Sequence, residues 1–114
     1  MIATIIKSKD GISRKVSDSY SVLNLLTANE SDKVSLAVST AKNHNETTKT
    51  TSDRVYYVLE GKLILNDKLI ASKGDVVFVP ANTEYNFSGS FRAILVNSPP
   101  FKADNESKLS SKDA

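Results

Sequence analysis

The chain has 114 residues, 39% of them hydrophobic and 25% charged, which is enough for one folded domain and too little for two. It contains no cysteine and a single histidine, so disulfides, thiolate nucleophiles and any metal site built on two histidines of one chain are excluded. The net charge of +2 comes from 15 basic and 13 acidic residues scattered along the chain, and this pattern offers no basic patch to a nucleic acid.

The N-terminal run at residues 1–6 is too short for the apolar core of a signal peptide, and no small-residue cleavage site follows it. No stretch of the sequence approaches the roughly 20 apolar residues that cross a membrane. We therefore expect a cytoplasmic protein without a membrane partner.

Short runs rich in β-branched and aromatic residues, separated by turn residues, predict strands along the chain. They cover residues 2–6, 21–26, 33–39, 54–59, 62–65, 69–71, 76–79 and 91–96. Glycines and prolines fall between these runs or at their ends, and no run has a helical period. Many short strands with close turns are typical of a sandwich or a barrel, so the sequence predicts an all-β fold.

Two segments are strongly polar. Residues 43–53 contain no aliphatic or aromatic side chain, which leaves two alternatives: a flexible loop, or a polar strand that lines a wet interior. Residues 102–114 are rich in lysine, serine and acidic residues, and we expect them to form a flexible C-terminal tail. The folded domain is therefore expected to span residues 1–101.

Residues 54–63 and 74–85 resemble the two sequence motifs of the cupin superfamily. The spacing from Gly74 to Pro80 matches the second motif, and the interval between Arg54 and Gly61 matches the first. The resemblance extends over about residues 34–101 and implies a double-stranded β-helix, the jelly-roll barrel of cupins. In that barrel Gly61 would end a strand at a tight turn where backbones approach closely.

The residues that bind metal in cupins are replaced in this chain. Arg54 stands where the family has a glutamate ligand, and Tyr85 stands where the second motif has a histidine. The paired histidines of the first motif correspond to Thr48 and Thr50 or, one residue earlier, to Thr47 and Lys49. A guanidinium about 4 Å from a divalent ion repels it by several kcal/mol at an effective dielectric of roughly 20, so we expect neither a metal nor another cofactor.

Strand alternation from Thr48 onward would turn one set of side chains into the barrel. With Tyr85 supplied by the neighbouring strand, as the resemblance implies, the ligand-binding set is Thr48, Thr50, Arg54, Tyr56 and Tyr85. Hydroxyls, an aromatic wall and a guanidinium suit an anionic or hydroxylated small molecule. In the alternative interpretation, Arg54 pairs with Asp53 or Glu84 and the tyrosines fill the barrel.

His44 and Glu46 are the remaining candidates for acid–base chemistry. They lie outside the spacing of the cupin motifs, and we expect His44 to be exposed to solvent in a polar loop, so their role is left open. Tyr57 and Phe78 are expected to be packing residues.

Three functions fit these observations: a small-molecule binding barrel, a metal-independent sugar isomerase or epimerase, and a non-catalytic structural or regulatory dimer. The enzyme would use Tyr56 or Tyr85 as its acid, but it also needs a general base, commonly a histidine with a carboxylate partner. The sequence leaves open whether the protein turns over a substrate. The run at residues 2–6 resembles an edge strand, and an unpaired edge strand can pair with the same strand of a second copy, so a homodimer is expected.

Overall fold

The computed structural model describes residues 2–102 and 106–113, with side chains described through residue 102, and within these ranges the chain is built from antiparallel strands. A single turn of 3₁₀ helix, Ser8–Asp10, precedes the first strand. The strands are β1 (Ile12–Ser17), β2 (Tyr20–Leu26), β3 (Ser35–Thr50), β4 (Asp53–Leu65), β5 (Leu69–Ser72), β6 (Val76–Val79), β7 (Glu84–Ser98) and β8 (Glu106–Asp113).

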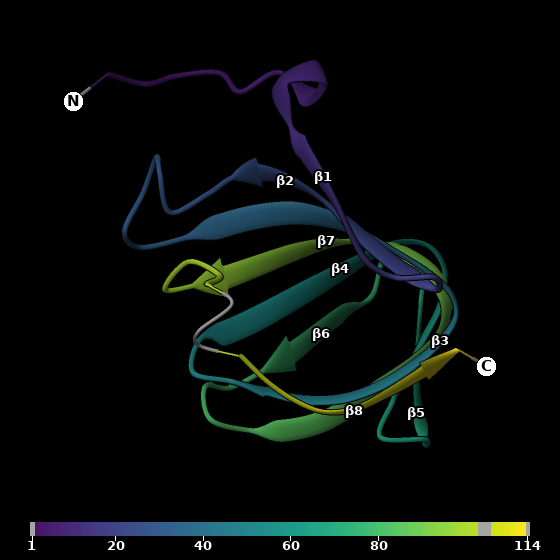
Figure 1. Ribbon diagram of the computed structural model, residues 1–114. Coiled ribbons are helices and arrows are strands. Elements are labelled where there is room, and N and C mark those ends of the chain that lie inside the picture. The colour runs from purple at the N-terminus through teal and green to yellow at the C-terminus, as the bar shows by residue number, and fades with distance from the viewer. Residues whose placement is uncertain (1, 103–105, 114) are drawn as a thin grey trace.

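Three long strands form the middle of the sheet, whose order is β1-β2-β3-β7-β4-β5. β7 pairs with β3 on one side and with β4 on the other along nearly its whole length. The two halves of β4 take different second partners, because β6 pairs with its first half and β5 with its second. Curving of these long strands closes the sheet into the expected all-β barrel, whose open end is crossed by β1 and β2 (Figure 1).

Several predicted strands coincide with observed ones, and others differ. The runs at 21–26, 69–71 and 76–79 are β2, β5 and β6. The run at 2–6 is not a strand: Ile2 and Ile5 are 93% and 79% exposed in a segment that extends away from the barrel (Figure 1). Strand β1 was not predicted, because its consecutive Ser, Arg and Lys residues carry little hydrophobic signal.

The C-terminal segment also differs from its expectation. We expected a flexible tail from residue 102, whereas residues 106–113 form β8 and pair with the second half of β3. Figure 1 shows β8 running beside that half of β3. The partner strand is the polar segment 43–53, so the second of its two alternatives, a polar strand at the wall of the barrel, is confirmed for residues 43–50.

A β-bulge in β3 decides which of its side chains face the interior. Ala41 pairs with Phe91 and His44 pairs with Gly89, so β3 has two residues where β7 has one. At the bulge Asn43 adopts φ 49°, a left-handed conformation that asparagine tolerates better than most residues. Before the bulge the odd-numbered residues are buried and after it the even-numbered ones, so the bulge turns His44 inward.

Gly61 lies within β4 rather than at its end. The register of β4 against β7 shifts between Val58 and Glu60, and Gly61 follows at φ +78°. A Cβ atom at Gly61 would overlap the carbonyl oxygen of Ser90. The close backbone approach that we expected at this glycine is therefore confirmed, although the strand continues through it to Leu65.

Aromatic side chains occupy the centre of the barrel. Phe87 of β7 is 1% exposed, and its ring lies 5.4–6.3 Å, centroid to centroid, from the rings of Tyr20, His44, Tyr56, Tyr85 and Phe91. Burying such a ring stabilises a fold by about 1.5–3 kcal/mol. Phe87 therefore joins the core of the barrel to the wall of its open end.

The outer surface of the barrel carries an unexpected apolar patch. Tyr57 and Phe78, which we expected to pack, are 42% and 56% exposed, because strand alternation turns them outward. They belong to a continuous set of outward side chains on three paired strands, which we call the outer apolar face: Val55, Tyr57, Val76, Phe78, Ile94 and Val96.

Candidate functional site

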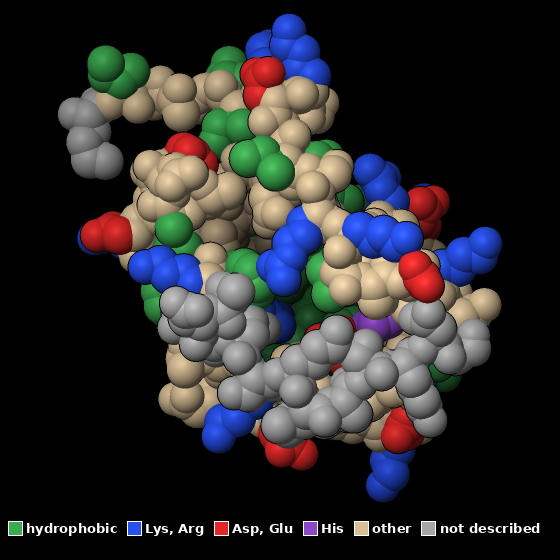
Figure 2. Space-filling view, in the orientation of Figure 1, with side chains coloured by type: hydrophobic (Ala, Val, Ile, Leu, Met, Phe, Trp, Pro, Cys, Tyr) green, Lys and Arg blue, Asp and Glu red, His purple; other side chains and the backbone are tan. Residues whose placement is uncertain are grey.

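A cavity of about 310 Å³ opens at the end of the barrel beneath β1 and β2. Its walls come from β1, β2, β3, β4 and β7, with Phe101 at the rim. Figure 2 shows the hollow in this face of the molecule, framed by basic and apolar side chains. Small-molecule sites in proteins typically measure about 300–1,000 Å³, so the cavity is large enough for a small metabolite.

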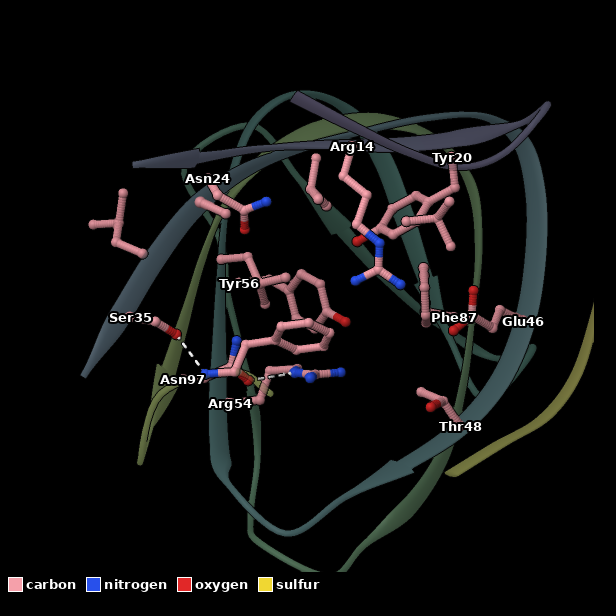
Figure 3. A pocket seen from close by; sticks show the side chains of 16 residues that line it. Arg14, Tyr20, Asn24, Ser35, Glu46, Thr48, Arg54, Tyr56, Phe87 and Asn97 are labelled. Carbon is pink, nitrogen blue, oxygen red and sulfur yellow. Dashed lines mark hydrogen bonds between the residues drawn. The ribbon is translucent and has the colours of Figure 1, made fainter. Parts of the chain in front are cut away.

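Arg54 projects from β4 into the barrel and lines the cavity (Figure 3). The residue is 4% exposed, its Nε donates to Asn97 Oδ1 at 2.7 Å, and its Nη1 donates to Tyr85 Oη at 2.9 Å. Asp53, by contrast, is exposed and accepts a hydrogen bond from the amide of Ala81. The guanidinium is thus hydrogen-bonded to Asn97 and Tyr85 inside the barrel.

Tyr56 and Tyr85 meet inside the barrel. Their hydroxyl oxygens lie 2.5 Å apart, and each residue is at most 3% exposed. Burial, followed by the neighbouring Tyr85, raises the pKa of Tyr56 well above the ordinary value of a phenol. Tyr56 is therefore a neutral hydrogen-bonding group at neutral pH.

Thr48 and Thr50 both face inward on β3 and are each 1% exposed. Thr48 lines the cavity, whereas Thr50 lies beyond it and accepts a hydrogen bond from the amide of Ser52. Of the five predicted site residues, Thr48, Arg54 and Tyr56 thus line the cavity, while Thr50 and Tyr85 stand behind its wall.

His44 is buried, which corrects the expectation of a solvent-exposed histidine. Its side chain is 0% exposed, because the bulge of β3 turns it inward. Nδ1 lies 2.6 Å from Ser19 Oγ, and Nε2 lies 2.8 Å from Glu46 Oε1. The ring also stacks on Tyr20, with centroids 4.9 Å apart and planes inclined by 12°.

Sequence reasoning missed five polar residues of the cavity wall: Arg14, Tyr20, Asn24, Ser35 and Asn97. Arg14 was missed because it lies on β1, which was not predicted. Its Cζ lies 5.6 Å from the centroid of the Phe101 ring. Asn97 could have been found, since strict alternation after Ala93 turns it inward. Burial raises the pKa of Tyr20, as it does for Tyr56.

The residues of the barrel do not fit the divalent metal of typical cupins. Among the residues whose side chains are described, no group of three or more His, Asp and Glu side chains could hold a metal ion. The positions of the usual ligands carry neutral hydroxyls and the Arg54 guanidinium. Such a donor set lacks the anionic oxygens and imidazoles that a divalent cation needs.

Helices of the described chain are too short and too polar to cross a membrane. No curated protein matches the sequence significantly.

Solved structures share the fold at low sequence identity. Pac13 from Streptomyces, described as a nucleoside dehydratase, superposes with a TM-score of 0.78 at 17% identity, covering 95% of this chain and 92% of its own. KdgF from Halomonas has a TM-score of 0.74 at 15% identity, covering 90% of this chain and 98% of its own. Both likenesses place the chain in the cupin fold.

A putative ethanolamine utilisation protein EutQ from Salmonella typhimurium matches at 24% identity with a TM-score of 0.66, over 72% of this chain and 71% of its own. The sequence itself matches the family model described as ethanolamine utilisation protein EutQ over residues 7–100. Because that match spans most of the barrel, the chain belongs to the EutQ family of cupin-fold proteins.

Proposed function

We propose that the barrel binds a small molecule that carries an anionic group and hydroxyl groups, in a pocket without metal. One observation carries the proposal: the guanidinium groups of Arg14 and Arg54 line the same cavity. Figure 3 shows Arg14 reaching in from β1 and Arg54 from β4. A guanidinium presents paired donors that match the two oxygens of a carboxylate or phosphate.

The rest of the wall supports the hydroxylated part of the proposed ligand. Asn24, Asn97, Thr48 and Tyr56 supply uncharged donors and acceptors, and Phe87 supplies an aromatic surface. Such groups orient a ligand through several directional hydrogen bonds rather than through charge.

The comparisons support the hydroxylated part of the proposed ligand. Variants of Streptomyces Pac13 were solved with uridine, a hydroxylated small molecule. That barrel and this one superpose with a TM-score of 0.79, so a ligand of similar size is compatible with the fold.

A thermal-shift screen of sugar phosphates and sugar acids tests the binding proposal. A binder at 100 times its Kd stabilises the folded state by about 2.7 kcal/mol, which raises the Tm by several degrees. Arg14→Met should abolish the shift without loss of fold, because Arg14 is exposed. Arg92→Met, an exposed arginine elsewhere on the barrel, is the matched control. A shift that survives Arg14→Met and Arg54→Met contradicts the proposed role of the arginines.

The metal-free state has a separate test. Elemental analysis of the purified protein should find less than one-tenth of an equivalent of transition metal, as a rough threshold, and EDTA should leave the ligand shift unchanged. Stoichiometric iron, manganese, nickel or zinc contradicts the proposal.

A second candidate function is a metal-independent isomerase or epimerase. The buried His44–Glu46 pair favours it, because such an enzyme needs a general base and this pair brings a histidine with a carboxylate partner into the barrel. Tyr56 adds a neutral phenol on the cavity wall.

We also propose that the protein forms a homodimer through the outer apolar face. Soluble monomers rarely expose a broad apolar patch, and here Tyr57, Val76 and Phe78 are each at least 42% exposed. The patch is continuous across three paired strands, so it can meet its own copy across a two-fold axis. The cytoplasmic location stays a prediction.

Sedimentation equilibrium tests the dimer. The wild-type chain should sediment as a dimer at micromolar concentrations, and Phe78→Lys should give monomers, because a buried ammonium has no partner there. Lys62→Gln, which also changes the charge by one unit but lies outside the patch, is the control. A monomeric wild-type chain contradicts the proposal.

A further inference from the structure

We propose that Glu46 is the proton acceptor of the cavity, that His44 and Ser19 hold it in position, and that the substrate is a hydroxylated carbonyl compound with an anionic group. This inference rests on the proposed binding function and assigns a reaction to the same site. It reverses the arrangement expected for an enzyme of this kind, in which the histidine would be the base.

Burial distinguishes the two residues of the pair. Glu46 lines the cavity and its side chain is 11% exposed, whereas the His44 side chain is 0% exposed and does not line the cavity. Oε1 of Glu46 is held by His44 Nε2, so Oε2 is the carboxylate oxygen that the imidazole does not hold. A ligand would therefore touch the carboxylate, and the imidazole stands behind it.

Both nitrogens of His44 have defined partners. With Glu46 ionised, Nε2 carries a proton and donates it to Oε1 in either charge state of the ring. Ser19 Oγ, at 2.6 Å from Nδ1, fixes the other edge of the ring. Stacking on Tyr20 leaves the imidazole little freedom to rotate, so the carboxylate is aimed by a rigid support.

Hydrogen-bond donors lie across the cavity from Glu46. Figure 3 shows Glu46 on β3 at one wall and Tyr56 and Arg54 extending from β4 on the other side. Arg54 donates to Tyr85, whose hydroxyl also bonds Tyr56, so the three groups form one chain of donors. Groups of this kind stabilise negative charge that develops on an oxygen during reaction.

The step that these groups support is proton abstraction next to a carbonyl. Glu46 Oε2 takes the proton from the carbon beside the carbonyl, and the electron pair of the broken C–H bond forms a C=C bond. The carbonyl electron pair moves to oxygen, where Tyr56 and Arg54 stabilise the enolate. Return of the proton from Glu46 to carbon restores the carbonyl, so the cycle needs no oxidant, reductant or cofactor. A positioned base of this kind contributes about 10²–10⁴-fold to the rate.

Deuterium exchange tests the assignment directly. The wild-type protein is incubated in D₂O with EDTA and either ribulose 5-phosphate or fructuronate, and ¹H NMR follows the carbon-bound protons. We expect exchange at one carbon beside the carbonyl, at least about 100-fold faster than without protein. Glu46→Gln should reduce exchange to the background rate while the probe still raises the Tm. Glu60→Gln, an exposed carboxylate on the outside of the barrel, should exchange like the wild type.

His44→Gln separates positioning from catalysis. If His44 acts through Glu46, kcat for exchange should fall about tenfold while the probe concentration at half-saturation stays within about twofold. An equal loss in Glu46→Gln and His44→Gln would identify the imidazole as the base and overturn the assignment.

Two results separate this inference from the binding proposal. A probe that raises the Tm of the wild type but exchanges no proton overturns the role of Glu46 and leaves the binding pocket standing. A series of probes that neither bind nor exchange contradicts the ligand class on which both proposals rest.

Discussion

The inner and outer sides of the barrel wall each carry side chains that most sheets place on the opposite side. At the open end of the barrel the inner side carries His44, Glu46 and Arg54, while the outer side of β4 and β6 carries Tyr57 and Phe78. A sheet with one solvated face normally places apolar residues inside and polar residues outside. Polar side chains inside suit the proposed ligand, and apolar side chains outside suit the proposed contact with a second copy.

The polar wall is placed beside a strong aromatic core. Burying charges without partners is costly, so each charged group of the wall has a defined neighbour, such as Asn97 for Arg54 and His44 for Glu46. Phe87 borders both regions, because it lines the cavity and contacts the ring of Phe91 below it. The stability of the barrel therefore depends on this boundary more than on the outer apolar face.

Two phenylalanines on opposite sides test this difference most strongly. Phe87→Ala removes a ring that is 1% exposed and should lower the free energy of unfolding by about 3–5 kcal/mol. Phe78→Ala, at a ring that is 56% exposed, should change it by less than about 1 kcal/mol at concentrations where the chain is monomeric. Urea unfolding followed by circular dichroism measures both. Equal losses in the two variants would mean that the outer apolar face also stabilises the monomer.

The fold was largely predictable from sequence because its signals are local. Hydrophobic runs and turn residues marked β2, β5 and β6, and the spacing of Gly74 and Pro80 identified the barrel. Strands β1 and β8 escaped prediction, because their residues carry little hydrophobic signal. The partner of β8, strand β3, is also far away in sequence.

The site was only partly predictable, because a bulge changes the parity of a strand. Counting by twos from Thr48 correctly turned Thr50, Arg54 and Tyr56 inward. Counting by twos does not reveal the bulge at Asn43, where the inward residues of β3 change from odd-numbered to even-numbered. The inward residues of β3 before the bulge therefore could not be assigned from Thr48. Arg14 could not be placed at the cavity from the sequence, because strand β1 was not predicted.

Substitution at the bulge tests what turns the polar side chains inward. Asn43→Val places a β-branched residue at φ 49° and should lower the free energy of unfolding by about 1–3 kcal/mol. Asn43→Gly adopts this conformation without strain and should be nearly neutral, although Asn43 Oδ1 loses its hydrogen bond from Ser90. Thermal unfolding compares the two. If Asn43→Val were as stable as the wild type, the bulge would not depend on the left-handed residue.

Two adjacent tyrosines provide the finest comparison, since Tyr56 faces inward and Tyr57 outward. Burial raises the pKa of Tyr56, so above pH 10 the unfolded chain loses a proton that the folded chain keeps. The unfolded state then binds fewer protons, and the free energy of unfolding falls as pH rises, by at most about 1.4 kcal/mol per pH unit for each such group. Tyr56→Phe should make the decline between about pH 10 and pH 11.5 shallower, whereas Tyr57→Phe should leave it unchanged. Urea unfolding at several alkaline pH values measures the slopes, and equal slopes in the wild type and Tyr56→Phe would mean that the Tyr56 hydroxyl reaches solvent.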